Sequence, residues 1–344
     1  MRRTVRTVVG SSAGELRAIA RTAPLGRRIS SSSDPRSSPG RPNEERASSR
    51  RHELAATRPA TVCKDVAMRL DVGRLARPPV EAIARLTGLR ASLHVARVFA
   101  EDMRALAGYL AQPTARRAEK AEAELAHTCD ECFEFSRAHF GGGPVQHRSE
   151  IASLLDLAQE NGTTIACEIG AWDAGTSVML SRVLNLSTLI VMDLYTRTRW
   201  RLRSAAPANQ TVHIIDGDSG HPLTARRLRR KLRGRKIDLL LIDGDHRWTG
   251  VRQDFLTYRE FVRDGGLIAF HDICEVRDPT VNAWVGDVPA FWRLIRSIYP
   301  CHEFVDSHDQ HGKGIGVVRY DPTRSIGSVL TATQPDSHAS SLSA

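Results

Sequence analysis

Two continuous apolar runs, about thirty residues apart, end in acidic and imidazole side chains. The first run ends in Asp243 and His246, and the second ends in His271 and Asp272. Carboxylate oxygens suit hard divalent cations, and an imidazole suits proton transfer near neutral pH. These side chains therefore predict a metal site, a general base, or both.

Both runs are typical of strands that are buried on both faces of a parallel sheet. Residues 248–262 lie between them and read as a helix, which is long enough for a crossover connection. With that crossover, strands 237–243 and 266–271 lie side by side. Their acidic tips then meet at the carboxyl edge of the sheet, where open α/β sheets place their sites.

A glycine turn follows another apolar strand, residues 164–169. Glu168 lies at the end of the strand and Gly170 directly follows it. Gly175 and Ser177 then open the next helix. Glycine lets a ligand approach the backbone, and a helix N-terminus offers free amides. The junction therefore predicts a binding turn.

The next strand, residues 188–193, ends in Asp193, 23 residues after Gly170. An acid at about this spacing suits the diol of a ribose. The turn lacks the Gly-x-Gly-x-x-Gly pattern that cradles a pyrophosphate, and it has no lysine for a triphosphate. The pattern therefore favours a nucleoside without phosphates.

These motifs resemble those of class I S-adenosylmethionine-dependent methyltransferases, over roughly residues 144–320. The matching residues are Glu168-Ile169-Gly170 with Gly175 and Ser177, Asp193, and Gly217-Asp218-Ser219. The two acidic strand ends resemble one branch of the family. That branch holds small-molecule O-methyltransferases, including sugar and macrolide O-methyltransferases and cephalosporin hydroxylase-like proteins.

The resemblance implies a cofactor site of seven residues: Glu168, Gly170, Gly175, Ser177, Asp193, Asp218 and Ser219. In it, Glu168 fixes the turn or the cofactor amine, and Asp193 binds the ribose hydroxyls. Asp218 and Ser219 meet the adenine. Plain structural roles remain open: Glu168 as a cap of backbone amides, and residues 218–219 as a polar turn.

The resemblance further implies that His246 is a general base, with Asp243 beside it. It also implies a metal site of Asp243, His271 and Asp272 that orients substrate oxygens. His271 stands where the family often has an acid, which leaves Mg²⁺, another divalent cation or no metal open. His246 as a structural loop histidine also stays open.

The function expected from the resemblance is methyl transfer from S-adenosylmethionine to a hydroxyl of a small metabolite, such as a sugar or a glycosylated natural product. One alternative is a non-catalytic S-adenosylmethionine-binding partner of a biosynthetic or hydroxylase system. The net charge of +10 could suggest a nucleic-acid substrate, but most of the excess lies in residues 1–60, which hold 13 Arg and 5 acids. A nucleic-acid substrate is therefore not favoured. The basic excess therefore belongs to a tail.

The predicted fold class is α/β, with a Rossmann-like, seven-stranded, mostly parallel sheet. Its last two strands, 302–306 and 314–320, read as an antiparallel hairpin. Four parts are expected: a disordered basic tail (1–60), a helical extension (61–143), the methyltransferase domain (144–320) and a flexible C-terminal tail (321–344). The extension caps the site or forms a contact in a homo-oligomer; the sequence does not decide.

The chain of 344 residues has six cysteines without a regular disulfide spacing, which predicts a reducing, cytoplasmic setting. No apolar run reaches 18 residues, so no membrane span is expected. Cys129-x-x-Cys132 is read as part of a helix rather than as half of a zinc site. Trp248 is a candidate wall of the substrate pocket, and Trp292 is expected in the core.

Overall fold

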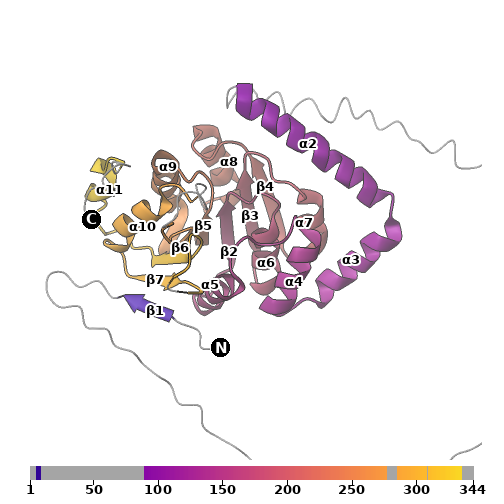
Figure 1. Cartoon of the computed structure of the whole chain (residues 1–344), viewed down its shortest axis with the longest axis horizontal. Helices are drawn as coiled ribbons and strands as arrows, with labels where there is room; N and C mark the ends of the chain where they lie inside the picture. Colours follow the sequence, from indigo (N-terminus) through magenta and orange to yellow (C-terminus); the bar gives the residue numbers. More distant parts are fainter. Residues whose placement is uncertain (1–4, 9–88, 277–284, 308, 335–344) are drawn as a thin grey trace, which may run out of the picture. The chain divides into compact units, whose positions relative to one another are not determined.

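The computed structural model describes residues 5–8, 89–276, 285–307 and 309–334 (Figure 1). The predicted disordered tail lies outside these residues, except for β1 (Val5–Val8). Residues 61–88 of the predicted helical extension also lie outside them. In the described part of the chain, no helix is long and apolar enough to cross a membrane.

Three helices precede the sheet: α2 (Leu89–Leu110), α3 (Pro113–Leu125) and α4 (Cys129–His139). Pro113 opens α3, where its missing N–H is harmless. Thr128 and Glu131 form a capping box that starts α4. Cys132 is buried in α4, and its thiol donates to the carbonyl of Ala126, so the helical interpretation of the cysteine pair is confirmed.

The sheet has the strand order β1-β7-β8-β6-β5-β2-β3-β4. Besides β1, its strands are β2 (Ile165–Ile169), β3 (Thr188–Asp193), β4 (Thr211–Asp216), β5 (Ile237–Ile242), β6 (Val262–His271), β7 (Cys301–Phe304) and β8 (Ile315–Arg319). Strands β2 to β6 are parallel. The final hairpin is antiparallel, as predicted.

The seven predicted strands are therefore confirmed. The structure adds β1, which pairs antiparallel with β7 at one edge of the sheet. A short helix, α11 (Gly327–Thr331), lies in the predicted C-terminal tail.

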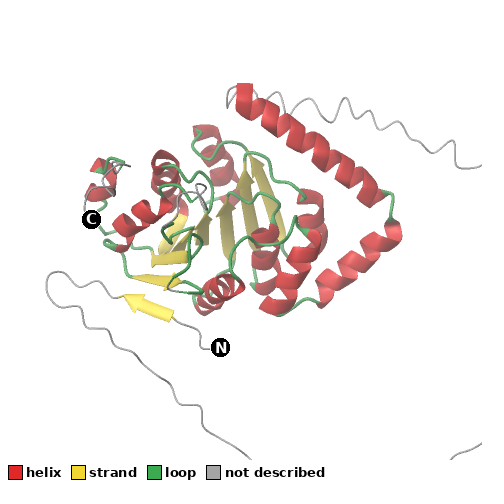
Figure 2. Ribbon diagram, in the orientation of Figure 1, coloured by secondary structure: helices red, strands yellow, loops and turns green. Residues whose placement is uncertain are grey.

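Helices cover both faces of the sheet (Figure 2). One apolar core takes in α4, α5 (Arg148–Glu160), α6 (Gly175–Val183) and α7 (Arg199–Ala205). The other takes in α8 (Pro222–Leu232), α9 (Trp248–Tyr258) and α10 (Val288–Arg296). Alternate residues of β5 enter the two cores, because successive side chains of a strand point to opposite faces.

Two tryptophans join the second core. Trp292 is buried, and its indole N–H donates to Glu303 over 2.6 Å, which confirms its predicted place. Trp248 is also buried, edge-on to Phe291 with ring centroids 5.6 Å apart. The candidate role of Trp248 as a pocket wall is therefore wrong: its ring serves the packing between α9 and α10.

Candidate active site

A cavity of about 660 Å³ opens at the carboxyl edge of the sheet, within the size range of small-molecule sites. The carboxyl ends of β2 to β6 and the loops that follow them form most of its wall, and α2 and Val145 supply the rest. Eight predicted residues line it: Gly170, Asp193, Asp218, Ser219, Asp243, His246, His271 and Asp272. The parallel strands thus bring together residues that are up to 102 positions apart in the sequence.

Three other predicted cofactor residues, Glu168, Gly175 and Ser177, lie behind the glycine turn and are buried. The hydroxyl of Ser177 donates to the carboxyl of Glu168. Burial raises the pKa of Glu168 to about 8, against the opposing effect of that hydrogen bond. The structure therefore places these residues where they support the turn, beneath the surface that a ligand would touch.

Gly170 allows the tips of β2 and β5 to meet. Its φ of +86° is one that L side chains rarely adopt, and an added Cβ would lie 1.9 Å from the carbonyl oxygen of Asp243. Its amide donates to Met192 across 2.8 Å, and the amide of Asp243 donates to Ile169 across 2.8 Å. The turn is therefore clamped between two neighbouring strands.

Asp193 is held by backbone amides on both of its oxygens. Trp172 N donates to Oδ2 over 2.9 Å, and Tyr195 N donates to Oδ1 over 3.1 Å. Burial raises the pKa of Asp193, while these amide hydrogen bonds oppose the rise. Each carboxylate oxygen can accept a further hydrogen bond, so the group is oriented to receive the two hydroxyls of a ribose.

The loop after β4 is held from below by α9. Tyr258 donates from its hydroxyl to the carbonyl of Ser219 over 2.6 Å. Asp218 accepts from Gly220 N over 2.8 Å, which closes a tight turn. Both predicted adenine-binding residues therefore sit on a braced loop that faces the cavity.

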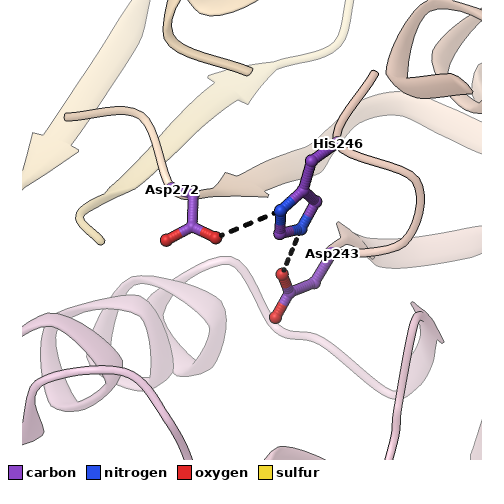
Figure 3. Close-up of side chains that lie close together, drawn as sticks. All are labelled: Asp243, His246 and Asp272. Carbon is purple, nitrogen blue, oxygen red and sulfur yellow. Dashed lines mark ion pairs between the residues drawn. The ribbon is translucent and has the colours of Figure 1, made fainter. Parts of the chain in front are cut away.

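Asp243, His246 and Asp272 meet across the tips of β5 and β6 (Figure 3). Nε2 of His246 lies 3.4 Å from Oδ1 of Asp243, and its Nδ1 lies 3.7 Å from Oδ2 of Asp272. One ligand atom from each residue falls within 4.8 Å of the others. Two carboxylates and one imidazole suit a divalent cation such as Mn²⁺ or Zn²⁺, and also Mg²⁺ with retained waters.

His271 occupies the buried side of this cluster. Its Nδ1 lies 3.1 Å from Oδ1 of Asp243 and 3.4 Å from Oδ2 of Asp272. Burial alone would lower the pKa of His271, but the two carboxylates outweigh it and raise the pKa. Within the described residues, its buried Nε2 has no hydrogen-bond partner. His271 therefore lies as a counter-charge beneath the two carboxylates. The compact three-residue group contains His246, and the metal site with His271 in its place stays a prediction.

Gln146 is a site residue that the sequence did not reveal. Its Nε2 donates to Oδ2 of Asp243 over 3.1 Å, and its Oε1 accepts from Thr176 over 2.9 Å. It links the glycine-turn helix to the acidic cluster. No motif marks it, because it lies in a loop 97 residues before its partner.

Asp254 is a second group to which the sequence assigned no role, and it lies beneath the adenine-side loops. It is buried on α9 and hydrogen-bonds to Ser219. Its Oδ2 would lie 3.2 Å from a Cβ added to Gly244. Burial raises the pKa of Asp254 to about 7, and the negative charges of Asp245 and Asp218 add to the rise.

An Asp254→Asn variant is expected to gain stability over the wild type as pH rises from about 4 to about 7. In that window the folded wild type keeps a proton that the unfolded chain has lost, so its free energy of unfolding falls with rising pH. Asparagine removes this loss of free energy of unfolding, which amounts to about 4 kcal/mol at most. Denaturant unfolding of both proteins at pH 5 and pH 8 measures the difference.

The exposed Asp264 gives the matched control, because Asp264→Asn changes the same chemical group in solvent. Its stability difference from the wild type should be the same at both pH values. If the Asp254→Asn difference is equally flat, the carboxyl of Asp254 is ionised throughout and the argument from burial is wrong.

Part of the chain also matches a known protein family. Residues 167–273 match the family model described as a methyltransferase domain. An uncharacterised protein of Acanthamoeba polyphaga mimivirus is 42% identical over 59 residues, which are 16% of this chain and 27% of that protein. The chain thus spans about a quarter of the length of this curated relative.

Two solved structures are distant likenesses. One is an O-methyltransferase from Bacillus cereus in complex with SAH, at 17% identity and a TM-score of 0.41, covering 56% of this chain and 90% of that one. The other is the O-methyltransferase TomG from Streptomyces achromogenes in complex with SAM, at 14% identity and a TM-score of 0.40, covering 58% and 94%. At these values, neither likeness supports a statement about function.

The match to the family model begins in β2 and ends just after Asp272, so it contains the glycine turn, Asp193 and the whole acidic cluster. The predicted Rossmann-like sheet and the placement of these residues on one cavity agree with it. Residues 167–273 are therefore similar to a methyltransferase domain, which agrees with the resemblance of their motifs to those of class I S-adenosylmethionine-dependent methyltransferases.

Proposed function

We propose that the protein transfers a methyl group from S-adenosylmethionine to a hydroxyl of a small metabolite. One observation carries this proposal: a single cavity joins Asp193, at the tip of β3, to Asp243, His246 and Asp272, at the tips of β5 and β6. A nucleoside held at one end of this cavity leaves its other end beside a base and two carboxylates. An acceptor and a methyl donor can therefore share the site.

The cofactor end of the cavity would be formed by three loops. Gly170 leaves the backbone of the turn bare, Asp193 accepts from the ribose hydroxyls, and the loop with Asp218 and Ser219 flanks the adenine. These groups would hold the sulfonium methyl towards β5 and β6. Methyl transfer then depends mainly on alignment of the methyl group and the acceptor oxygen.

The acceptor end has the means to take a proton. His246 lines the cavity and lies between two carboxylates, which stabilise the imidazolium that forms when it accepts a proton. A divalent cation held by Asp243, His246 and Asp272 would lower the pKa of an acceptor hydroxyl and orient it. In the first case His246 is the base, and in the second it is a ligand.

Sugars and glycosylated natural products are the acceptors that the sequence resemblance suggests. The acid–histidine cluster in the same cavity favours an enzyme over a non-catalytic S-adenosylmethionine-binding partner, because cofactor binding alone has no use for a base.

Calorimetric titration of S-adenosylmethionine into the protein tests the cofactor assignment. Micromolar binding is expected, and Asp193→Ala should weaken it by a factor of about 10–100, the effect of losing hydrogen bonds to a charged group. Asp264→Ala removes an exposed aspartate from β6 and should bind as the wild type does. Absence of binding by the wild-type protein would remove the methyltransferase assignment.

The same titration in the presence of Mg²⁺ or Mn²⁺ tests the cation. Mn²⁺ binding, followed by electron paramagnetic resonance, should weaken at least about tenfold in Asp272→Asn. Asparagine suits this test because Asp272 has a φ of +63°, a region that asparagine tolerates. If the wild type binds neither ion, with or without S-adenosylmethionine, the cation has no place in the mechanism and His246 remains as the base.

A further inference from the structure

Helix α2 forms part of the cavity wall, although it precedes β3 by almost 80 residues. Val95 and Val98 are 2% and 8% exposed and pack with Tyr195 in a small apolar cluster. Phe99 meets the same tyrosine edge-on, with ring centroids 5.6 Å apart. The helix therefore covers the segment that follows Asp193.

A buried carboxylate fastens this helix to that segment. Asp102 is 3% exposed, and its two oxygens accept from the hydroxyl of Tyr195 and from the amide of Thr198, each over 2.9 Å. Both donors belong to the connection between β3 and α7. A buried carboxylate is stable only when such donors satisfy it, so the contact is specific in position.

Tyr195 links this fastening to the ribose-binding acid. Its amide donates to Oδ1 of Asp193, and its hydroxyl donates to Asp102. The guanidinium of Arg199 lies 4.2 Å from the centroid of its ring and binds Asp216 through two hydrogen bonds of 2.6 and 2.8 Å. Tyr195 thus ties α2 and the tip of β3 together directly, and it reaches the tip of β4 through Arg199.

We infer that Asp102 and Tyr195 are positioning residues for the cofactor: their hydrogen bond latches α2 over the nucleoside and fixes the orientation of Asp193. This inference rests on the proposed function and identifies α2 as the helix that covers its cofactor site. Neither residue needs to touch the reacting atoms. Loss of the hydrogen bond between Asp102 and Tyr195 would release α2 from the site and let the bound cofactor leave faster.

The test uses the full chain with Tyr195→Phe, Asp102→Asn and the double variant. Each single change should weaken S-adenosylmethionine binding about tenfold and raise its dissociation rate, as measured by calorimetry and stopped-flow. Tenfold corresponds to about 1.4 kcal/mol, the size of one hydrogen bond. The double variant should lose much less than a hundredfold, because both changes act on the same hydrogen-bonded contact.

Hydrogen exchange gives a readout that does not depend on the cofactor. The amides of residues 94–110 should exchange faster in both single variants than in the wild type, because α2 is released more often. Tyr109→Phe is the matched control: it removes the same hydroxyl from a tyrosine on α2 whose ring packs on Trp200, and whose hydroxyl forms no hydrogen bond within the described residues. Its exchange and its affinity for S-adenosylmethionine should equal those of the wild type.

The outcomes separate this inference from the function on which it rests. A wild-type protein that does not bind S-adenosylmethionine overturns both. If the wild type binds S-adenosylmethionine and both Tyr195→Phe and Asp102→Asn bind it with the same affinity, only the positioning role of Asp102 and Tyr195 is overturned. Lower thermal midpoints with unchanged affinity also overturn it, since they would assign the pair to stability and not to cofactor positioning.

Discussion

A Gly170→Ala variant is expected to lose S-adenosylmethionine binding and about 3 kcal/mol or more of its free energy of unfolding. The φ of +86° alone costs an alanine about 1–2 kcal/mol. The added methyl would also lie 1.9 Å from the carbonyl oxygen of Asp243, a backbone atom that cannot rotate away. Relief requires the tips of β2 and β5 to separate, and such shifts cost about 1–3 kcal/mol more.

The separation would also disturb function. Those two tips carry the turn that faces the cofactor and the carboxylate that serves the acceptor. Calorimetry should detect no binding at S-adenosylmethionine concentrations that saturate the wild type, and denaturant unfolding should show the lost stability.

Gly234→Ala is a matched control, because Gly234 has a φ of +82° and no heavy atom within 4 Å of an added Cβ. It should show the conformational cost alone and bind the cofactor normally. Equal stability losses in the two variants would mean that the contact with Asp243 contributes nothing.

The strands were predictable because burial on both faces leaves a continuous apolar run that few other structures produce. For the same reason the tip residues Asp193, Asp243 and Asp272 were found: a carboxylate that directly follows such a run must lie at the carboxyl edge. Position along a strand is a local property. The sequence therefore located the site well wherever its residues end strands.

The contacts that depend on loops and on distant helices were not predictable. The loop after β5 turns His246 back between the two carboxylates, whereas His271, on the strand itself, is buried as their counter-charge. Gln146 and Asp102 reach the site from segments whose sequences carry only helical or turn patterns. Their roles arise from tertiary packing, which periodicity does not encode.

Glu168 shows a further limit. Its place at the end of β2, under the glycine turn, was predicted, but the sequence left open whether it serves the turn or the cofactor amine, since a strand-end acid can face either the interior or the ligand. The neighbouring Ser177 provides a hydrogen bond that accommodates the buried carboxyl. Which side an acid faces depends on the backbone twist at the turn, and two residues of that turn, Trp172 and Ala174, have positive φ values that no sequence rule predicted.

A His246→Ala variant is expected to transfer methyl groups about 10²–10⁴-fold more slowly than the wild type, the usual contribution of a general base. Binding of S-adenosylmethionine should change less than about threefold, because His246 contacts Asp243 and Asp272 and no residue of the ribose site. The cluster stays compensated in the variant, since His271 and Gln146 still contact Asp243. Transfer of radiolabelled methyl groups to an acceptor found in a panel of hydroxylated metabolites measures the rate.

The base and ligand roles of His246 differ in their effect on the cation. If His246 is the base alone, His246→Ala binds Mn²⁺ as the wild type does, and its rate loss is the same at every Mn²⁺ concentration. If His246 is a ligand, the variant binds Mn²⁺ at least about tenfold more weakly, and excess Mn²⁺ restores part of the rate. His302→Gln, on β7 and outside the cavity wall, should leave rate and ion binding unchanged. A His246→Ala rate within threefold of the wild type would exclude both roles, because removal of a general base or of a metal ligand would slow methyl transfer more than that.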